Sequence, residues 1–219
     1  MNILGGVISA LLVIGGFFSL IFLTFHIVYV KSQVIGFSMQ PYINSTMTDP
    51  TASGDTIYIN KFHDIELNDV VVAKVSWHKD SVIKRVVGTP GDTVEIRDLG
   101  DKYGLYVNEK ELYTREKTDE DAHGGGDGSD GYFQTFQTLL SNPNYQDHIV
   151  MNSQNNPCFK LSEDEYFLMG DNWGETVDSS THGPVKRNEI VGRVELLIPI
   201  GQSSFGPVVN LILSKTFGI

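Results

Sequence analysis

A serine and a lysine in this chain of 219 residues are candidates for a nucleophile and its base. Ser38 lies in the run GFSMQP (residues 36–41), and Lys84 lies beside Arg85 in the apolar run VIKRVV (residues 82–87). A serine becomes a nucleophile when a nearby base removes its proton. A lysine amine with an ordinary pKa of about 10.4 needs roughly 4–5 kcal/mol to be neutral near pH 7, and burial in apolar surroundings produces shifts of this size. Taken singly, the two fragments are also typical of a common turn and of a solvent-facing strand lysine.

Histidine and cysteine offer other chemistries. His182 follows Asp178 closely enough for a Ser-His-Asp arrangement to be an alternative to a lysine base. The histidines show neither H-x-x-x-H nor C-x-x-C spacing, so we expect no metal site, and we expect no cofactor. Cys158 is the one cysteine, which rules out an internal disulfide and is typical of a small buried residue.

The charge balance argues against a nucleic-acid partner. The chain has 27 acidic residues against 16 Lys+Arg, a formal net charge of −11, whereas nucleic-acid affinity comes from clustered basic residues. Residues 98–131 hold 10 acidic and 4 basic side chains and therefore supply −6 of this charge. Hydrophobic residues at 41% and charged residues at 20% are typical of a globular protein, and the length suits one domain with a small insertion.

An uncharged stretch at the N-terminus predicts a membrane anchor. Residues 3–30 contain no charged side chain, and as a helix they would be about 42 Å long against a hydrocarbon core of about 30 Å. A cleaved secretory signal fits poorly, because the stretch lacks a basic start, is too long and is not followed by an A-x-A site. Lys31 weakly favours a cytoplasmic body. We expect His26 to lie near the membrane interface.

The elements that must position Ser38 and Lys84 are predicted to be strands. Seven runs alternate or are rich in β-branched residues, and no second long helix is expected, which indicates a mainly β, antiparallel fold. The expected strands are 56–59, 69–75, 82–87, 93–97, 105–108, 166–169 and 190–198.

We divide the chain into an anchor at 3–30, a catalytic β core at 32–97 and 160–200, a variable β-rich insertion at 98–159 and an apolar tail at 201–219. Residues 116–131 (EKTDEDAHGGGDGSDG) predict an acidic flexible loop, because they contain no aliphatic side chain larger than alanine. A calcium site is the alternative there, although the EF-hand spacing is absent. The tail is too short to span a bilayer and is expected at the membrane surface or against the body.

The fragments around Ser38 and Lys84 become diagnostic only as part of four sequence blocks taken in order. They are GFSMQP at 36–41, GDTIYINK at 54–61, KRVVGTPGD at 84–92, and GDN at 170–172 followed by Asp178-Ser179 and Gly183-Pro184-Val185. The series resembles the bacterial type I signal peptidases, membrane-anchored S26-type serine proteases with a Ser/Lys dyad. The resemblance covers roughly residues 30–97 and 160–200, and the segment between them carries no family signature.

The resemblance implies a role for individual residues. Ser38 matches the family's nucleophile and Lys84 its general base, so that an acyl-enzyme forms and water hydrolyses it. The Ser38 N–H would help to bind the oxyanion, and the Thr176 hydroxyl would orient the Lys84 amine. The residues matched to substrate-binding or supporting positions are Gly36, Met39, Pro41, Arg85, Asp171 and Asp178.

The last block departs from the family pattern G-D-N-R-x-x-S-x-D-S-R. Trp173 and Ser180 stand where the family has arginine, and Thr176 replaces a serine. The loss of arginine at Ser180 removes a charge partner from Asp178. By analogy with the family, we expect Asp171 to pair with Arg85.

The resemblance also implies substrate and location. It predicts signal-peptide-bearing preproteins with small residues at −1 and −3, bound as extended strands. It also predicts a single-pass protein of the bacterial cytoplasmic membrane, in contact with membrane lipid, whose catalytic domain is extracytoplasmic, against the weak indication from Lys31. Two alternatives are a catalytically inactive, membrane-tethered homologue that binds exported chains, and a peptidase of the same fold with a narrower precursor substrate.

Overall fold

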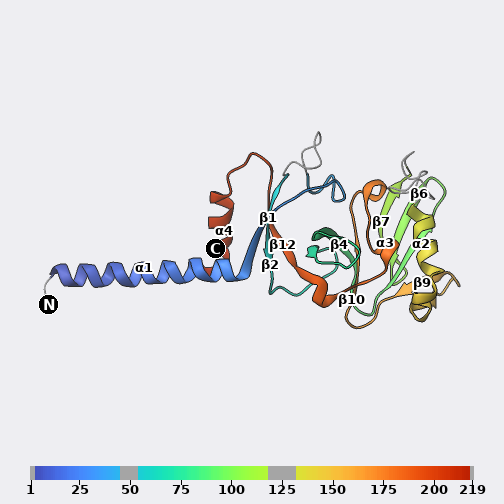
Figure 1. The fold of residues 1–219 in the computed structure, drawn as a ribbon, viewed down its shortest axis with the longest axis horizontal. Coiled ribbons are helices and arrows are strands. Elements are labelled where there is room, and N and C mark those ends of the chain that lie inside the picture. Colours follow the sequence, from blue (N-terminus) through green and yellow to red (C-terminus); the bar gives the residue numbers. More distant parts are fainter. Residues whose placement is uncertain (1–2, 45–53, 118–131, 218–219) are drawn as a thin grey trace.

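The computed structural model describes residues 3–44, 54–117 and 132–217. Helix α1 (Ile3–Val28) projects from the β-rich body as a rod (Figure 1), and nearly all its side chains are exposed. Within the described residues, it is the one helix long and apolar enough to cross a membrane, which is consistent with a membrane anchor. The helix ends two residues before the predicted anchor does, because the chain enters strand β1 at Tyr29.

The larger sheet has seven strands, all paired antiparallel, in the order β1-β2-β12-β3-β4-β10-β11. Its strands are β1 (Tyr29–Gln33), β2 (Thr56–Asn60), β3 (Val70–Ala73), β4 (Val82–Gly88), β10 (Glu165–Met169), β11 (Val185–Lys186) and β12 (Ile190–Ile198). Strand β4, which carries Lys84, lies between β3 and β10, so both of its edges are paired.

The second sheet is also antiparallel, has five strands in the order β7-β6-β5-β9-β8, and lies farther from α1 (Figure 1). Its strands are β5 (Thr93–Asp98), β6 (Lys102–Val107), β7 (Lys110–Glu116), β8 (Ile149–Met151) and β9 (Pro157–Lys160). Strand β5 therefore pairs with β6 and β9 of the insertion side, although five of its six residues, 93–97, belong to the predicted catalytic core. The division into catalytic core and insertion stays a prediction.

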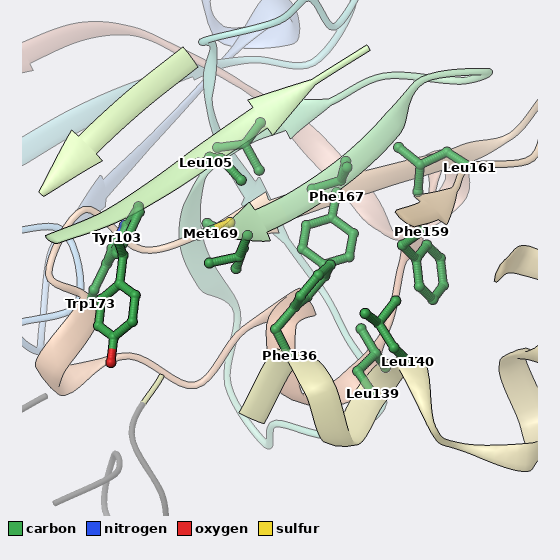
Figure 2. Packing of buried hydrophobic residues seen from close by; sticks show 13 residues of the cluster. Tyr103, Leu105, Phe136, Leu139, Leu140, Phe159, Leu161, Phe167, Met169 and Trp173 are labelled. Atoms are coloured by element: carbon green, nitrogen blue, oxygen red, sulfur yellow. The ribbon is translucent and has the colours of Figure 1, made fainter. Parts of the chain in front are cut away.

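The helices are short apart from α1. They are α2 (Tyr132–Leu140), α3 (Ser179–His182) and α4 (Phe205–Phe217), with 3₁₀ turns at Pro143–His148, Trp173–Glu175 and Arg187–Glu189. Phe136, Leu139 and Leu140 lie at helical spacing on α2 and face the aromatic side chains of Phe159 and Phe167 (Figure 2). The second sheet thus buries one face against α2, in a core that continues to the end of β10.

The mainly β, antiparallel prediction is confirmed, and all seven predicted strands are present. Helices α2 and α4 differ from the prediction, which gives a β-rich insertion and no helix in the tail. In α2 the aromatic and leucine side chains recur at intervals of three and four residues, a helical signal in only nine residues. Of the predicted acidic loop, Glu116 ends β7, and residues 118–131 lie outside the described residues.

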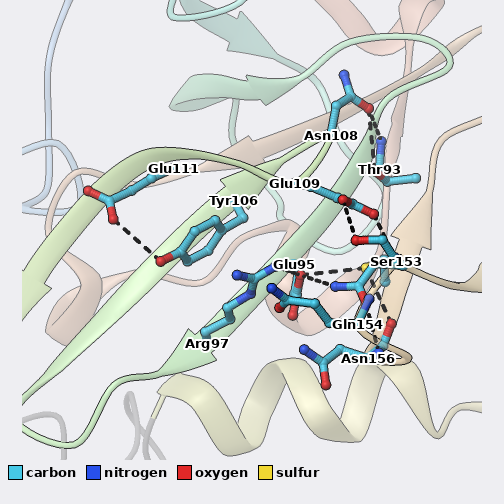
Figure 3. A network of polar contacts seen from close by, with 12 residues as sticks. Thr93, Glu95, Arg97, Tyr106, Asn108, Glu109, Glu111, Ser153, Gln154 and Asn156 are labelled. Atoms are coloured by element: carbon cyan, nitrogen blue, oxygen red, sulfur yellow. Dashed lines mark hydrogen bonds and ion pairs between the residues drawn. The ribbon is translucent and has the colours of Figure 1, made fainter.

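A buried carboxylate ties the strands of the second sheet together. Glu95 on β5 is 5% exposed and accepts hydrogen bonds from Arg97 at 2.7 Å and Asn152 at 2.9 Å (Figure 3). The Arg97 guanidinium also lies 3.9 Å from the ring centroid of Tyr106. Burial, with Glu95 nearby, raises the pKa of the Cys158 thiol to about 12. A buried thiol that stays protonated has a structural role here.

Candidate active site

Lys84 is a buried lysine in the middle of the larger sheet. It lies on the same face of β4 as the buried side chains of Val82 and Val86, and it faces Val71 across the strand pair. Its exposed fraction is 4%. Burial is the main cause that lowers the pKa of this amine, and the carboxylates of Asp178 and Asp171 act in the opposite direction. The apolar strand thus favours the neutral amine that a general base requires.

Ser38 lies on the segment that follows β1. Met39 and Ile43 are buried in a cluster with Ile57, so hydrophobic burial fixes this segment against the sheet. The Ser38 side chain is directed at the lysine, and Lys84 Nζ lies 2.7 Å from Ser38 Oγ, within hydrogen-bond distance. The two residues are 46 positions apart in the sequence, so only the folded chain brings the hydroxyl and the amine together.

The segment after β10 runs directly against the serine. The Asn172 N–H donates to the Ser38 carbonyl at 3.0 Å, and the Asn172 side-chain amide donates to the Phe37 carbonyl at 3.4 Å. A Cβ at position 170 would lie 2.5 Å from the Ser38 carbonyl oxygen and would also overlap Thr176. Gly170 therefore permits a close backbone approach that a side chain would prevent. Neither Gly170 nor Asn172 was among the predicted site residues, although both lie in the quoted GDN block.

Asp178 is a fully buried carboxylate close to the dyad. Its Oδ2 accepts from the Gly170 N–H at 3.0 Å and from the Thr176 hydroxyl at 3.1 Å. Its Oδ1 accepts from the Ser180 N–H at 3.0 Å and from the Ser180 hydroxyl at 2.7 Å. Ser180 thus gives Asp178 neutral donors at the position where the family pattern has arginine.

Thr176 contacts the acid rather than the base. Within the described part of the chain, its hydroxyl hydrogen-bonds to Asp178 and not to the Lys84 amine. Its exposed fraction is 6%. Direct orientation of Lys84 by Thr176, as the resemblance implies, is not seen in this arrangement.

Arg85 and Asp171 form the expected ion pair. Arg85 Nε lies 2.8 Å from Asp171 Oδ1 and its terminal nitrogen lies 2.6 Å from Oδ2, a two-point contact. The same guanidinium donates to the Asn68 carbonyl at 3.0 Å and lies 4.8 Å from the ring centroid of Tyr42. The pair places a cation against a carboxylate that would otherwise raise the pKa of Lys84 more strongly.

The remaining predicted site residues lie around the serine. Gly36 has a φ of +94°, in the left-handed region that favours glycine, and it brings no side chain to the site. Met39 is 2% exposed and serves as the apolar anchor of the segment. Pro41 is exposed and follows a cis peptide bond.

The position of His182 does not support a histidine base for Ser38. The ring of His182 stacks on Trp77 at 4.8 Å between centroids, its backbone carbonyl accepts from the Tyr145 hydroxyl, and the described hydrogen bond of Ser38 Oγ involves Lys84. Burial lowers the pKa of the His182 imidazole. Among the residues that the structure describes, no group of three or more His, Cys, Asp or Glu side chains is arranged to hold a metal ion.

Trp173, the second departure from the family pattern, is 7% exposed and packs in the same core as Met169 and Tyr103 (Figure 2). An aromatic side chain at this position extends the core of the second sheet toward the GDN segment. The substitution for arginine therefore exchanges a charge for buried apolar surface.

Comparison with known proteins places the chain in a family. The family model "Signal peptidase, peptidase S26" matches residues 12–198. A signal peptidase I of Streptococcus pneumoniae is 32% identical over 67% of this chain and 75% of its own length. Signal peptidase I P of Bacillus subtilis subsp. natto is 29% identical over 74% of this chain and 77% of its own.

Signal peptidase IB of Staphylococcus aureus is likewise 29% identical, over 77% of this chain and 82% of its own. The family match covers most of the chain, including both the segment that carries Ser38 and the strand that carries Lys84. The chain therefore belongs to peptidase family S26 and has the activity of a signal peptidase I, a membrane-bound serine peptidase whose substrates are preproteins that carry a signal peptide.

Proposed function

We propose that Ser38 and Lys84 are the catalytic dyad of this signal peptidase. The observation that carries the proposal is the 2.7 Å contact between Ser38 Oγ and Lys84 Nζ, made by an amine whose pKa is lowered by burial. Ser38 Oγ attacks the scissile carbonyl carbon while its proton passes to Lys84 Nζ, and the protonated amine then gives this proton to the leaving nitrogen. Water, deprotonated by the same amine, hydrolyses the ester and restores the Ser38 hydroxyl.

The backbone N–H of Ser38 is proposed as a donor to the oxyanion. Among the described residues, this N–H has no hydrogen-bond acceptor, so it is available to a substrate oxygen. The two Asn172 contacts, to the Ser38 and Phe37 carbonyls, hold the peptide groups on both sides of the nucleophile in place. Preorganised donors of this kind stabilise charge that develops in the transition state.

Thr176 is proposed to act through Asp178. The Thr176 hydroxyl donates a hydrogen bond to one oxygen of the Asp178 carboxylate. The negative charge of Asp178 raises the pKa of Lys84. A hydrogen-bonded carboxylate at a fixed distance gives the amine a defined electrostatic environment. Thr176 is thus a positioning residue for Asp178, which in turn influences the base.

The substrate and location follow from the family and from α1. We propose that the preproteins carry small residues at −1 and −3, and that the chain crosses the bacterial cytoplasmic membrane once with its catalytic domain on the extracytoplasmic side. A preprotein anchored in the same bilayer by its signal peptide meets the dyad at a high effective concentration. Membrane lipid is the other partner, and no nucleic acid is expected, because the net charge is −11.

Cleavage of a preprotein ending its signal peptide in Ala-x-Ala tests the dyad. We expect Ser38→Ala and Lys84→Met to lower kcat/KM by about 10³-fold or more, because either change removes the nucleophile or its base. Ser32→Ala and Lys74→Met, at exposed positions, are the matched controls and should cleave normally. Unchanged cleavage by either dyad variant would refute the proposal.

The same assay separates the alternatives. Retention of the preprotein by the wild-type chain without any product would show an inactive binding homologue, and cleavage of only some precursors would show a narrower substrate range. Orientation is tested by adding a protease to sealed membrane vesicles. Digestion of the body only in vesicles that expose the extracytoplasmic face supports the proposed topology, and digestion from the cytoplasmic face contradicts it.

A further inference from the structure

Helix α4 packs against the body end of α1. Val208, Leu211 and Ile212 of α4 contact an apolar cluster that includes Phe25 and Tyr29. Figure 1 shows α4 running across the direction of α1 rather than alongside it. A helix of 13 residues is about 20 Å long and cannot span a hydrocarbon core of about 30 Å.

A second apolar row on α4 is left open. Phe205, Val209 and Leu213 recur at every fourth position and therefore lie on one face of the helix, next to the row that contacts α1. Phe205 is 78% exposed and Leu213 is 36% exposed. Asn210 and Ser214 are exposed and lie on the face opposite the two apolar rows taken together. The apolar surface of α4 therefore extends beyond the residues that contact the end of α1.

Val209 and Leu213 of this open row, together with Ile212, form one wall of a groove whose other wall is α1. The groove has a volume of about 780 Å³, within the range of small-molecule sites. Its lining is apolar except for Ser19 and His26, and it includes Phe18 and Phe22 of α1 with Val209 and Leu213 of α4. A groove with so few polar groups selects a hydrocarbon chain rather than a polar ligand.

A polar cluster lies where α4 contacts the body, on the same side of the helix as Val208 and Leu211. Lys215 forms an ion pair with Glu195 at 2.5 Å, and the same carboxylate accepts from the Tyr29 hydroxyl at 2.8 Å and the Asn60 amide at 2.7 Å. Because ion pairs are costly in hydrocarbon, this cluster indicates the aqueous boundary of the membrane at the end of α1. Phe62, which is 70% exposed, follows Lys61, whose N–H donates to the Val28 carbonyl. Aromatic side chains favour this interfacial level.

We propose that α4 lies in the plane of the membrane interface and that lipid acyl chains fill the groove between α4 and α1. The groove residues of α1 belong to the membrane anchor, so lipid is the solvent that surrounds this surface. The apolar row of α4 continues the lipid-exposed surface of α1, while its Asn210 and Ser214 face points to headgroups and water. The inference rests on α1 as the anchor and is independent of the Ser38/Lys84 dyad.

Nitroxide accessibility in the full chain tests this placement. Single cysteines replace Phe205, Val209 and Leu213 on the apolar row and Asn210 and Ser214 on the opposite face, in a Cys158→Ala background, and each labelled protein is reconstituted in phosphatidylcholine–phosphatidylglycerol vesicles. Labels on the apolar row should be accessible to oxygen and shielded from a water-soluble nickel chelate, with the reverse for the other two positions.

Depth measurements distinguish an in-plane helix from an inserted one. Positions 205 and 213 are separated by about 12 Å along the helix, so an in-plane α4 gives both labels nearly the same depth, and an α4 along the membrane normal gives depths that differ by about that length. Cleavage of a soluble peptide by each labelled protein verifies that the body is folded and keeps this test separate from the dyad.

Three outcomes would overturn the proposal. Access of the nickel chelate to all five positions would place α4 in water. Burial of all five in the bilayer core would show an inserted segment. Shielding of the apolar row from both reagents would show that protein fills the groove, either a second copy of this chain or, if the shielding appears only when preprotein is added, the apolar helix of a signal peptide.

Discussion

The amine of Lys84 is subject to opposing electrostatic influences. Burial on β4 lowers its pKa, and this effect is larger than the opposing effect of Asp178 and Asp171. Each carboxylate is itself held by partners, Asp178 by hydroxyl and backbone donors and Asp171 by Arg85. The protonation state of the base is therefore set by a few neighbouring groups, and changes to these groups should alter the pH dependence of cleavage in predictable directions.

Substitutions of the ion pair should move the pH profile in opposite directions. Arg85→Met leaves the Asp171 carboxylate without its two-point partner, so the pKa of Lys84 rises and the ascending limb of kcat/KM moves to higher pH. Asp171→Asn removes a negative charge, lowers the pKa of Lys84 and moves the limb to lower pH. Peptide cleavage across a pH series measures both, and limbs that move in the same direction would contradict this electrostatic account.

Lys84→Met should stabilise the inactive protein at neutral pH. Since the folded-state pKa of Lys84 is lowered, the unfolded chain binds one more proton between that pKa and about 10.4, and the free energy of unfolding rises with pH through this window. Near pH 7 the wild type is therefore destabilised by the cost of burying the deprotonated Lys84. The Lys84→Met variant has no amine to titrate, so its free energy of unfolding lacks this pH dependence. Each kcal/mol regained raises Tm by about 2–4 °C.

Thermal unfolding in detergent at pH 7 and pH 10 measures this effect. The gain in Tm over wild type should be larger at pH 7 than at pH 10. Ser38→Ala is the matched control, because it is also inactive yet keeps the lysine and its pH dependence. An equal Tm difference at both pH values would show that Lys84 is not destabilised by burial.

At the scale of elements, the site is the meeting point of three segments. Strand β4 supplies Lys84, the segment after β1 supplies Ser38, and the segment after β10 holds the serine through Asn172. The departures from the family pattern belong to the third segment. Trp173 adds buried apolar surface and Ser180 adds hydrogen bonds to Asp178, so each has a local structural role in place of a charge.

The close approach of the third segment should be sensitive to a single methyl group. Gly170→Ala would push the segment away from the Ser38 carbonyl, since the new Cβ would lie 2.5 Å from that oxygen. Displacement of a catalytic group by about 1 Å can cost 10²-fold in rate, and we expect a loss of about that size in kcat/KM. Gly206→Ala, where a Cβ meets no atom within 4 Å, is the control and should retain activity.

At the scale of the whole molecule, the rod-like α1 and the β-rich body perform separable tasks (Figure 1). Within the described residues, the contacts of α1 with the body are concentrated at its last turns, in the apolar cluster of Phe25, Tyr58 and Ile198 that also receives α4. Of the proposed dyad, Lys84 lies on β4 and Ser38 on the segment after β1, so neither group comes from α1. We therefore expect α1 to affect cleavage through the location of the body rather than through a chemical group.

Deletion of residues 1–28 should therefore affect membrane substrates selectively. We expect kcat/KM for a bilayer-embedded preprotein to fall by about 10²-fold or more, because co-localisation is lost, and that for a soluble peptide to change little. Replacement of α1 by an unrelated apolar helix of equal length should restore preprotein cleavage. Equal losses on both substrates would show that α1 contributes to the active site itself.

Much of this molecule follows from local sequence patterns. The uncharged run at 3–30 predicts α1, because hydrocarbon excludes charge over its full thickness, and alternation predicts strands such as Val82–Gly88, because a strand buries every second side chain. The order of four motif blocks placed Ser38 and Lys84 in family roles. Each of these signals is contained within one segment or in the order of segments.

Contacts between segments were decided by the tertiary structure. The sequence did not indicate that Thr176 would bind Asp178 in place of Lys84, that Asn172 would hold the Ser38 carbonyl, or that α4 would pack on the end of α1. Periodicity reports which side of a segment is buried. It does not report strand order and register, and these determine which distant side chains meet. The sequence by itself therefore determined the long apolar helix and the strands and indicated which two side chains to propose as the reacting groups, because these signals are local. The fold alone determined the 2.7 Å distance between the hydroxyl of Ser38 and the amine of Lys84.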